Sequence, residues 1–111
     1  MCNIESGINL IKRELLTKYP IRGGYGKSFE DAIEFDIQAA SKFVELEHNL
    51  VRFLGANIHK MYRVNKQHLK KHEDKIYDIL HVAEIDSYRE KFVTEIYFNI
   101  TDCWNRKNKK N

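Results

Sequence analysis

The stretches Lys75-Ile-Tyr-Asp-Ile-Leu-His-Val-Ala-Glu-Ile85 and Lys91-Phe-Val-Thr-Glu-Ile-Tyr-Phe-Asn-Ile-Thr101 decide the predicted fold. β-Branched and aromatic residues dominate both stretches, and these residue types are enriched in strands. The segment Asp86-Ser87-Tyr88-Arg89 between them is typical of a hairpin connection. The two stretches therefore predict an antiparallel pair of strands.

A further strand is expected over residues 60–69, joined to the pair through His72-Glu73-Asp74. The three strands would form an antiparallel meander. A competing signal comes from Ser87 and Glu90, whose spacing matches a helical capping box. The β composition outweighs this signal, and an all-α bundle remains the alternative fold.

The segment 29–55 fits two patterns. Apolar and acidic residues alternate over 31–37, as in a half-buried strand, and a helix over 39–54 that ends at Gly55 would follow. The apolar residues of the whole segment also recur at helical spacing, interrupted only by Glu47. We expect the strand and helix, with one continuous helix as the alternative.

The N-terminal part of the chain predicts a helix and a turn. Apolar residues recur at helical spacing over 4–18, and Pro20 follows shortly. Three of the five glycines fall in 22–28, which indicates a tight turn or loop. Together these elements predict a small α+β domain, with a meander of about three to four strands packed with one or two helices.

The length of 111 residues suits one domain, which we place at 1–104, followed by a basic, disordered tail at 105–111. The sequence shows no secretory signal and no apolar stretch long enough to span a membrane. Cys2 and Cys103 are the only two cysteines, so no disulfide framework is expected. We therefore expect a cytoplasmic protein without a membrane partner.

Charge is distributed in blocks. The formal net charge is +3, but the tail carries four bases and no acid. Residues 59–75 contain six bases and two acids, a pattern that could follow a phosphate backbone. The hypothesis of nucleic-acid binding rests on this stretch and the tail, and its candidate residues are Lys60, Arg63, Lys66, Lys70 and Lys71.

The run Gly26-Lys27-Ser28 matches only the end of a phosphate-binding loop. The full motif requires a glycine five residues before Gly26, where this chain has Ile21. A weaker hypothesis is that backbone N–H groups of the turn, with Arg22 and Lys27, hold an anion. A turn that simply requires glycine is the simpler interpretation.

Two histidines, His68 and His72, lie four residues apart. On a helix they would share a face and could bind one metal ion, but on a strand they would lie about 13 Å apart. The predicted strand therefore argues against a metal site, and we expect no cofactor. A small hydrolase or nuclease using His59, His68, His72 or His81 with Glu73 is a further alternative, although no residue is assigned a catalytic role.

The leading functional hypothesis is a non-enzymatic protein-interaction module or subunit. It rests on the lack of a catalytic constellation and on aromatic residues in the predicted strands. Tyr77 and Tyr97 could lie on an exposed sheet face and mark a surface for a protein partner or a second copy, although core packing is the favoured explanation of these aromatic residues. Nucleic-acid binding is the alternative and is less favoured.

Overall fold

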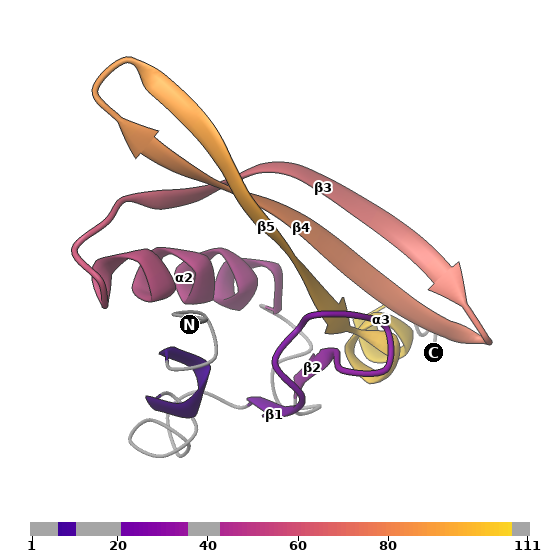
Figure 1. Cartoon of the computed structure of the whole chain (residues 1–111). Coiled ribbons are helices and arrows are strands. Elements are labelled where there is room, and N and C mark those ends of the chain that lie inside the picture. The colour runs from indigo at the N-terminus through magenta and orange to yellow at the C-terminus, as the bar shows by residue number, and fades with distance from the viewer. Residues whose placement is uncertain (1–6, 11–20, 36–42, 108–111) are drawn as a thin grey trace.

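The computed structural model describes residues 7–10, 21–35 and 43–107 (Figure 1). These residues form a small α+β domain, which confirms the predicted fold class and excludes the all-α alternative. The described elements are β1 (Ile21–Gly23), β2 (Ile33–Phe35), α2 (Phe43–Ala56), β3 (Tyr62–His72), β4 (Lys75–Asp86), β5 (Arg89–Asn99) and α3 (Thr101–Lys107).

One sheet joins the five described strands in the order β1-β2-β5-β4-β3. β3, β4 and β5 form the predicted antiparallel meander, with β3 at its edge. Both hairpins have two-residue loops: His72 pairs with Lys75, and Asp86 pairs with Arg89. Ser87 has a φ of 53°, so it lies in a hairpin turn and does not cap a helix.

Two bulges lie opposite the same part of β4. Asn65 is the extra residue on β3, and Val93 is the extra residue on β5. Bulges increase the local right-handed twist of a strand pair. The meander is accordingly long and strongly twisted, and α2 lies across one of its faces (Figure 1).

The face of the meander that α2 covers is called the inner face, and the opposite one the outer face. Leu80 of β4 lies opposite Gln67 and Ile96 on the inner face. Its neighbour His81 lies opposite Lys66 and Glu95 on the outer face. Side chains alternate between the two faces along β4, and the register with β4 then assigns the paired residues of β3 and β5 to a face on both sides of the bulges.

The main core lies between the inner face and α2. The rings of Phe35 and Phe98 stack there with their centroids 5.5 Å apart. The stacked rings join β2 to the meander, and so does the parallel pairing of Ile33 with Phe98. The buried apolar side chains of this core include Ile8, Ile33, Phe35, Phe43, Leu50, Val51, Leu54, Leu80, Val82, Ile96, Phe98 and Ile100.

The structure corrects several predicted boundaries. The expected turn at 22–28 begins inside β1, whose pairing with β2 was not predicted. The third strand of the meander, β3, runs to His72, beyond the expected end at residue 69. At the carboxyl end, α3 extends to Lys107, so the helix includes the first residues of the expected tail. Most of the helix expected over 4–18 lies outside the described residues. The part that is described, residues 7–10, is helical.

The helix α2 continues one residue past the glycine that was expected to end it. A Cβ atom built on Gly55 would lie 2.8 Å from Tyr62 Cγ and 2.9 Å from the Lys60 carbonyl oxygen. Gly55 therefore allows α2 to approach the start of β3. None of the described helices is long and apolar enough to cross a membrane.

We expect Gly55→Ala to lower the free energy of unfolding by about 1–3 kcal/mol, because the added methyl group overpacks the contact with Tyr62. Alanine favours helix over glycine, so a variant that is more stable than the wild type would contradict this close approach. Urea unfolding measures the effect. The exposed residue Arg52 of the same helix provides the control, since Arg52→Ala should change stability by at most about 0.5 kcal/mol.

Candidate functional site

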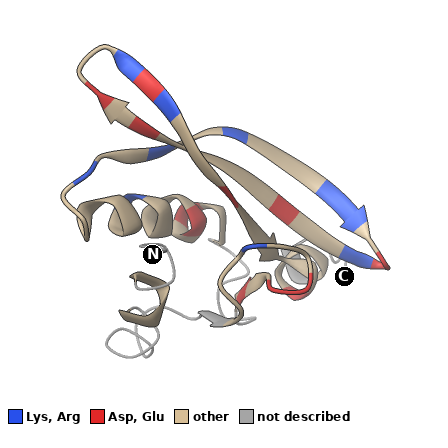
Figure 2. Ribbon diagram, in the orientation of Figure 1, with Lys and Arg blue, Asp and Glu red and all other residues tan. Residues whose placement is uncertain are grey.

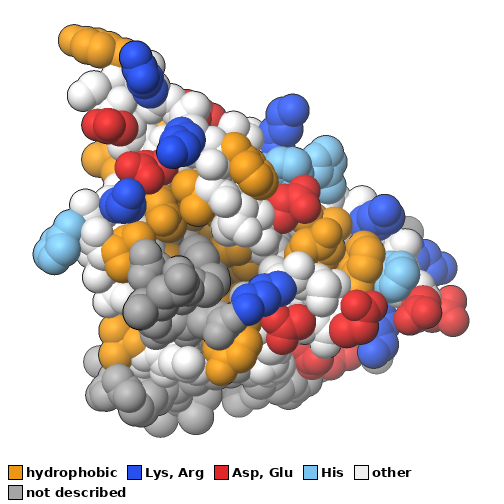
Figure 3. All heavy atoms as spheres, in the orientation of Figure 1, with side chains coloured by type: hydrophobic (Ala, Val, Ile, Leu, Met, Phe, Trp, Pro, Cys, Tyr) orange, Lys and Arg blue, Asp and Glu red, His pale blue; other side chains and the backbone are white. Residues whose placement is uncertain are grey.

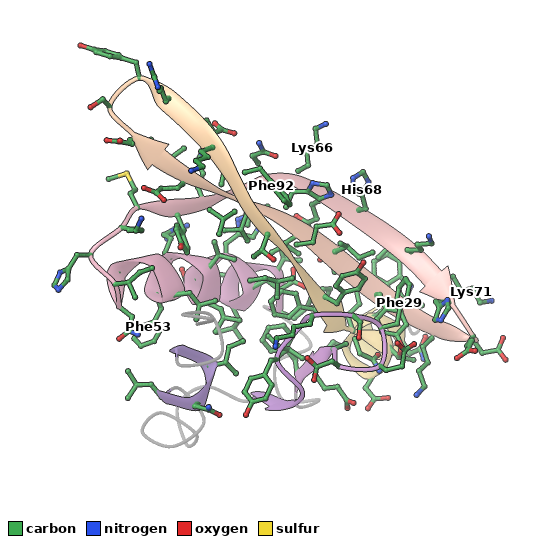
Figure 4. The ribbon with its side chains drawn as sticks, in the orientation of Figure 1. Phe29, Phe53, Lys66, His68, Lys71 and Phe92 are labelled. Carbon is green, nitrogen blue, oxygen red and sulfur yellow. The ribbon has the colours of Figure 1, made fainter. Side chains whose placement is uncertain are left out.

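Three of the predicted nucleic-acid-binding residues share the outer face. Arg63, Lys66 and Lys70 form a row along β3, which we call the basic row (Figure 2). Lys66 and His68 project from β3 away from α2 (Figure 4). Lys71 pairs with Ile76 and lies on the inner face, and Lys60 precedes β3.

Arg63, at one end of the basic row, and the nearby Lys60 each have an acidic partner. Arg63 forms an ion pair with Glu90, which also accepts a hydrogen bond of 2.6 Å from the Asn65 side chain. These hydrogen bonds lower the pKa of Glu90 from its ordinary value. Lys60 lies 3.2 Å from Glu84. Lys66 is exposed, and basic and histidine side chains gather over β3 on the surface (Figure 3).

An aromatic cluster covers one end of the outer face. The Phe29 ring stacks on His72 with a centroid separation of 4.0 Å and meets Tyr77 and Tyr97 edge-on at 4.8 and 5.1 Å. Lys70 Nζ lies 5.8 Å from the same ring. Tyr77 is consequently only 5% exposed, so the interpretation that it marks an exposed partner surface is wrong, and the favoured alternative of packing holds for Tyr77.

Three histidines, His68, His72 and His81, lie on the meander. His68 and His72 both belong to β3, so the strand separates them as predicted. His68 instead meets His81 across the strands, with ring centroids 5.0 Å apart, and His81 lies 2.8 Å from Glu95. Within the described part of the chain, no group of three or more His, Cys, Asp or Glu residues could hold a metal ion.

The predicted anion-binding turn uses its backbone donors internally. Gly24 N–H donates to the Ala32 carbonyl at 3.0 Å, and Gly26 N–H donates to the Asp31 carbonyl at 2.6 Å. Lys27 N–H donates to the Asp31 side chain at 3.4 Å. The side chain of Arg22 lies outside the described residues. The N–H groups named here are therefore engaged within the turn.

A second candidate site, which we call the inner pocket, opens on the inner face. It is a cavity of about 400 Å³ at the start of α2, against β3, β4 and α3. Its walls are largely apolar, and Leu69 on them is 54% exposed. The lining residues are Phe43, Val44, Gln67, Leu69, Asp78, Ile100 and Trp104.

Two buried carboxyl groups, those of Glu47 on α2 and Asp78 on β4, lie at and behind this pocket. Gln67 Nε2 donates to Asp78 Oδ2 at 2.6 Å, and Gln67 Oε1 lies 3.4 Å from His48 Nε2. Glu47 Oε1 and Oε2 and Asp78 Oδ1 have no hydrogen-bond donor among the described residues when both groups are ionised. Buried charges without donors are costly, so this pair requires a proton.

Glu47 retains that proton. Burial, the hydrogen bond with Asp78, the charge of Asp78 and that of Cys103 raise the pKa of Glu47 to about 11. A protonated Glu47 can donate to Asp78, which turns two repelling groups into a hydrogen-bonded pair. Glu47 is therefore protonated near neutral pH.

This carboxyl pair was not predicted. The available signals were Glu47, which interrupts the apolar stripe of α2, and Asp78, which lies inside an apolar strand. Neither position alone indicates that the two groups meet, because they are far apart in the sequence.

Comparison of the chain with known protein families, curated proteins and solved structures finds no match.

Proposed function

We propose that the protein is a non-enzymatic interaction module that binds an acidic, extended segment of a protein partner along β3. The observation that carries the proposal is the edge position of this eleven-residue strand. Among the described residues, β3 has one neighbouring strand, β4. An edge strand offers unpaired N–H and C=O groups to a segment that adds to the sheet.

The charges of β3 favour an acidic partner. Lys66 and Lys70 line its outer face, and Lys71 lies on the inner face. A segment with alternating acidic side chains could pair with lysines on one face while its backbone bonds to the strand. Lysine on an exposed edge also opposes indiscriminate strand pairing, so the same residues would select the partner.

A second copy of the chain fits this edge poorly. Antiparallel pairing of two β3 strands near His68 would bring Lys66 of one copy close to Lys70 of the other. Like charges placed opposite each other on a sheet are destabilising. The row therefore supports an acidic partner over self-association through β3.

The test is binding of a synthetic peptide with alternating Glu and Val to the full chain. We expect Lys66→Glu combined with Lys70→Glu to weaken this binding about tenfold or more, because two attractive contacts become repulsive. The matched control is Arg89→Glu combined with Lys91→Glu, which makes the same change in net charge on the exposed β4–β5 hairpin. Titration calorimetry should give a change of less than about twofold for this control.

Equal weakening by both double variants would show that only net charge matters and would contradict binding along β3. Failure of the wild-type chain to bind the peptide at low salt would also count against the proposal.

The alternative function is binding of single-stranded nucleic acid on the outer face. The observation that favours it is Phe92, which is 59% exposed beside His81, with ring centroids 6.0 Å apart, on the same face as the basic row. Exposed aromatic rings next to cations are typical of surfaces on which bases stack. Short RNA that binds more tightly than the peptide, with an affinity reduced by Phe92→Ala, would support this function instead.

A further inference from the structure

The inner pocket has the properties of a ligand site and not of a packing gap. Its volume of about 400 Å³ falls within the range of small-molecule sites. Phe43, Leu69 and Trp104 provide apolar and aromatic walls, and Gln67 and Asp78 are the polar lining groups. Small-molecule sites commonly combine such walls with a few polar groups that fix the orientation of the ligand.

Asp78 is the polar group that decides what this pocket can hold. It is 2% exposed and lines the cavity, and apart from the proton of Glu47 its Oδ1 has no donor among the described residues. An ionised carboxyl group accepts about four hydrogen bonds, whereas Asp78 receives one from Gln67 and one from protonated Glu47. Acceptor capacity therefore remains on a buried group that faces the cavity.

The charge around Asp78 is not balanced by the lining. Among the described residues that line the inner pocket, none is Lys, Arg or His. Glu47 keeps its proton, and Asp78 is the one acidic residue among the described residues of the lining, in a largely apolar setting. A ligand that brings a positive charge and N–H donors would offset the cost of burying this charge.

We propose that the inner pocket binds a small amphipathic ammonium ligand, with its apolar body against Phe43, Leu69 and Trp104 and its ammonium group at Asp78. The aromatic walls add to this preference, because cations are attracted to the faces of aromatic rings. A carboxylate of the same shape would be repelled by Asp78, and an alcohol would gain a hydrogen bond without the charge. This site is separate from the basic row, which lies on the outer face.

The experiment compares three ligands with the same phenyl body: 2-phenylethylammonium, 2-phenylethanol and 3-phenylpropanoate. Trp104 is the only tryptophan of the chain and lines the pocket, so its fluorescence reports occupancy. We expect the ammonium ligand to bind about tenfold or more tightly than the alcohol, as one charge-assisted hydrogen bond allows, and the carboxylate to bind least. This comparison uses the wild-type chain and does not depend on the folding of a variant.

A variant then tests whether Asp78 is the source of the preference for the ammonium ligand. Asp78→Asn should bring the affinities for the ammonium ligand and the alcohol within about threefold of each other, since it removes the charge and keeps the shape. Asp86→Asn, on the exposed end of the same strand, is the matched control and should retain the wild-type preference.

Saturable binding with the order ammonium, alcohol, carboxylate, lost in Asp78→Asn, supports the site. No saturable change in Trp104 fluorescence with the ammonium ligand overturns it. Equal binding of the carboxylate, or an unchanged preference in Asp78→Asn, overturns it as well. Because none of these ligands is a peptide, failure here leaves the peptide test at β3 unaffected.

Discussion

Replacing Phe98 by alanine is expected to lower the free energy of unfolding by about 3–5 kcal/mol. Phe98 is fully buried, and its ring stacks on Phe35 of β2. It also pairs with Ile33 in the parallel register that joins β2 to the meander. The substitution therefore removes core packing and weakens the attachment of β1 and β2 together. A domain of this size has only about 5–15 kcal/mol of stability, so the loss would be a large fraction of the total.

Denaturant unfolding measures this loss as a shift of the midpoint. Phe92 on the same strand is the matched control, because it is 59% exposed and lies on the outer face. Phe92→Ala should change the free energy of unfolding by at most about 0.5 kcal/mol. Hydrogen exchange should also show that β2 loses protection in Phe98→Ala before β4 does. Similar losses of stability in both variants would contradict the placement of the core on the inner face.

The meander could be predicted from the sequence because its signals are local. β-Branched and aromatic runs over 75–85 and 91–101 specify strands, and the short polar segments between them specify turns. Both hairpins pair through two-residue loops, so neighbouring strands in the sequence are neighbours in the sheet. Local propensity and final pairing agree here, which is why the α+β class was predicted correctly.

The pairing of the short strands could not be predicted in the same way. β2 lies inside the alternating segment 31–37 and was predicted as a strand. β1 has only three residues and leads into a glycine-rich turn, so it has no periodic signal of its own. The parallel contact of β2 with β5 joins Ile33 to Phe98, which lie 65 residues apart in the sequence. Such a contact depends on how the core packs and not on any local pattern.

The candidate sites show the same contrast between features that local sequence predicts and features that depend on distant contacts. The basic residues of 59–75 were evident from composition, and strand alternation then separates Lys66 and Lys70 from Lys71. The interpretation of Tyr77 as part of an exposed surface was wrong because Phe29, forty-eight residues earlier in the sequence, covers its ring. The inner pocket was missed for the same reason, since it requires the start of α2 to pack beside β3, β4 and α3, which are distant in the sequence.

The carboxyl pair predicts a pH dependence of stability that one substitution should remove. The pKa of Glu47 is raised from 4.5 to about 11, so folded protein holds a proton that the unfolded chain releases. Unfolding therefore releases this proton between these two pH values. The stabilisation is complete below about pH 4.5 and is lost as pH rises towards about 11, with the unfolding equilibrium constant rising about tenfold per pH unit.

We expect Glu47→Gln to flatten this dependence between about pH 5 and about pH 8, because the glutamine amide donates to Asp78 at every pH. Across that range the wild type should lose about a thousandfold in folding equilibrium constant through Glu47 alone, and the variant should not. Asp78 and Cys103, whose charges act on the pKa of Glu47, are present in both the wild type and the variant. Urea unfolding at several pH values therefore isolates the carboxyl group itself.

Glu45, which lies exposed in the first turn of α2, supplies the control. Glu45→Gln removes the same charge from the same helix and should keep the wild-type pH dependence. If Glu47→Gln and the wild type lost stability in parallel from about pH 5 to about pH 8, Glu47 would not hold the buried proton.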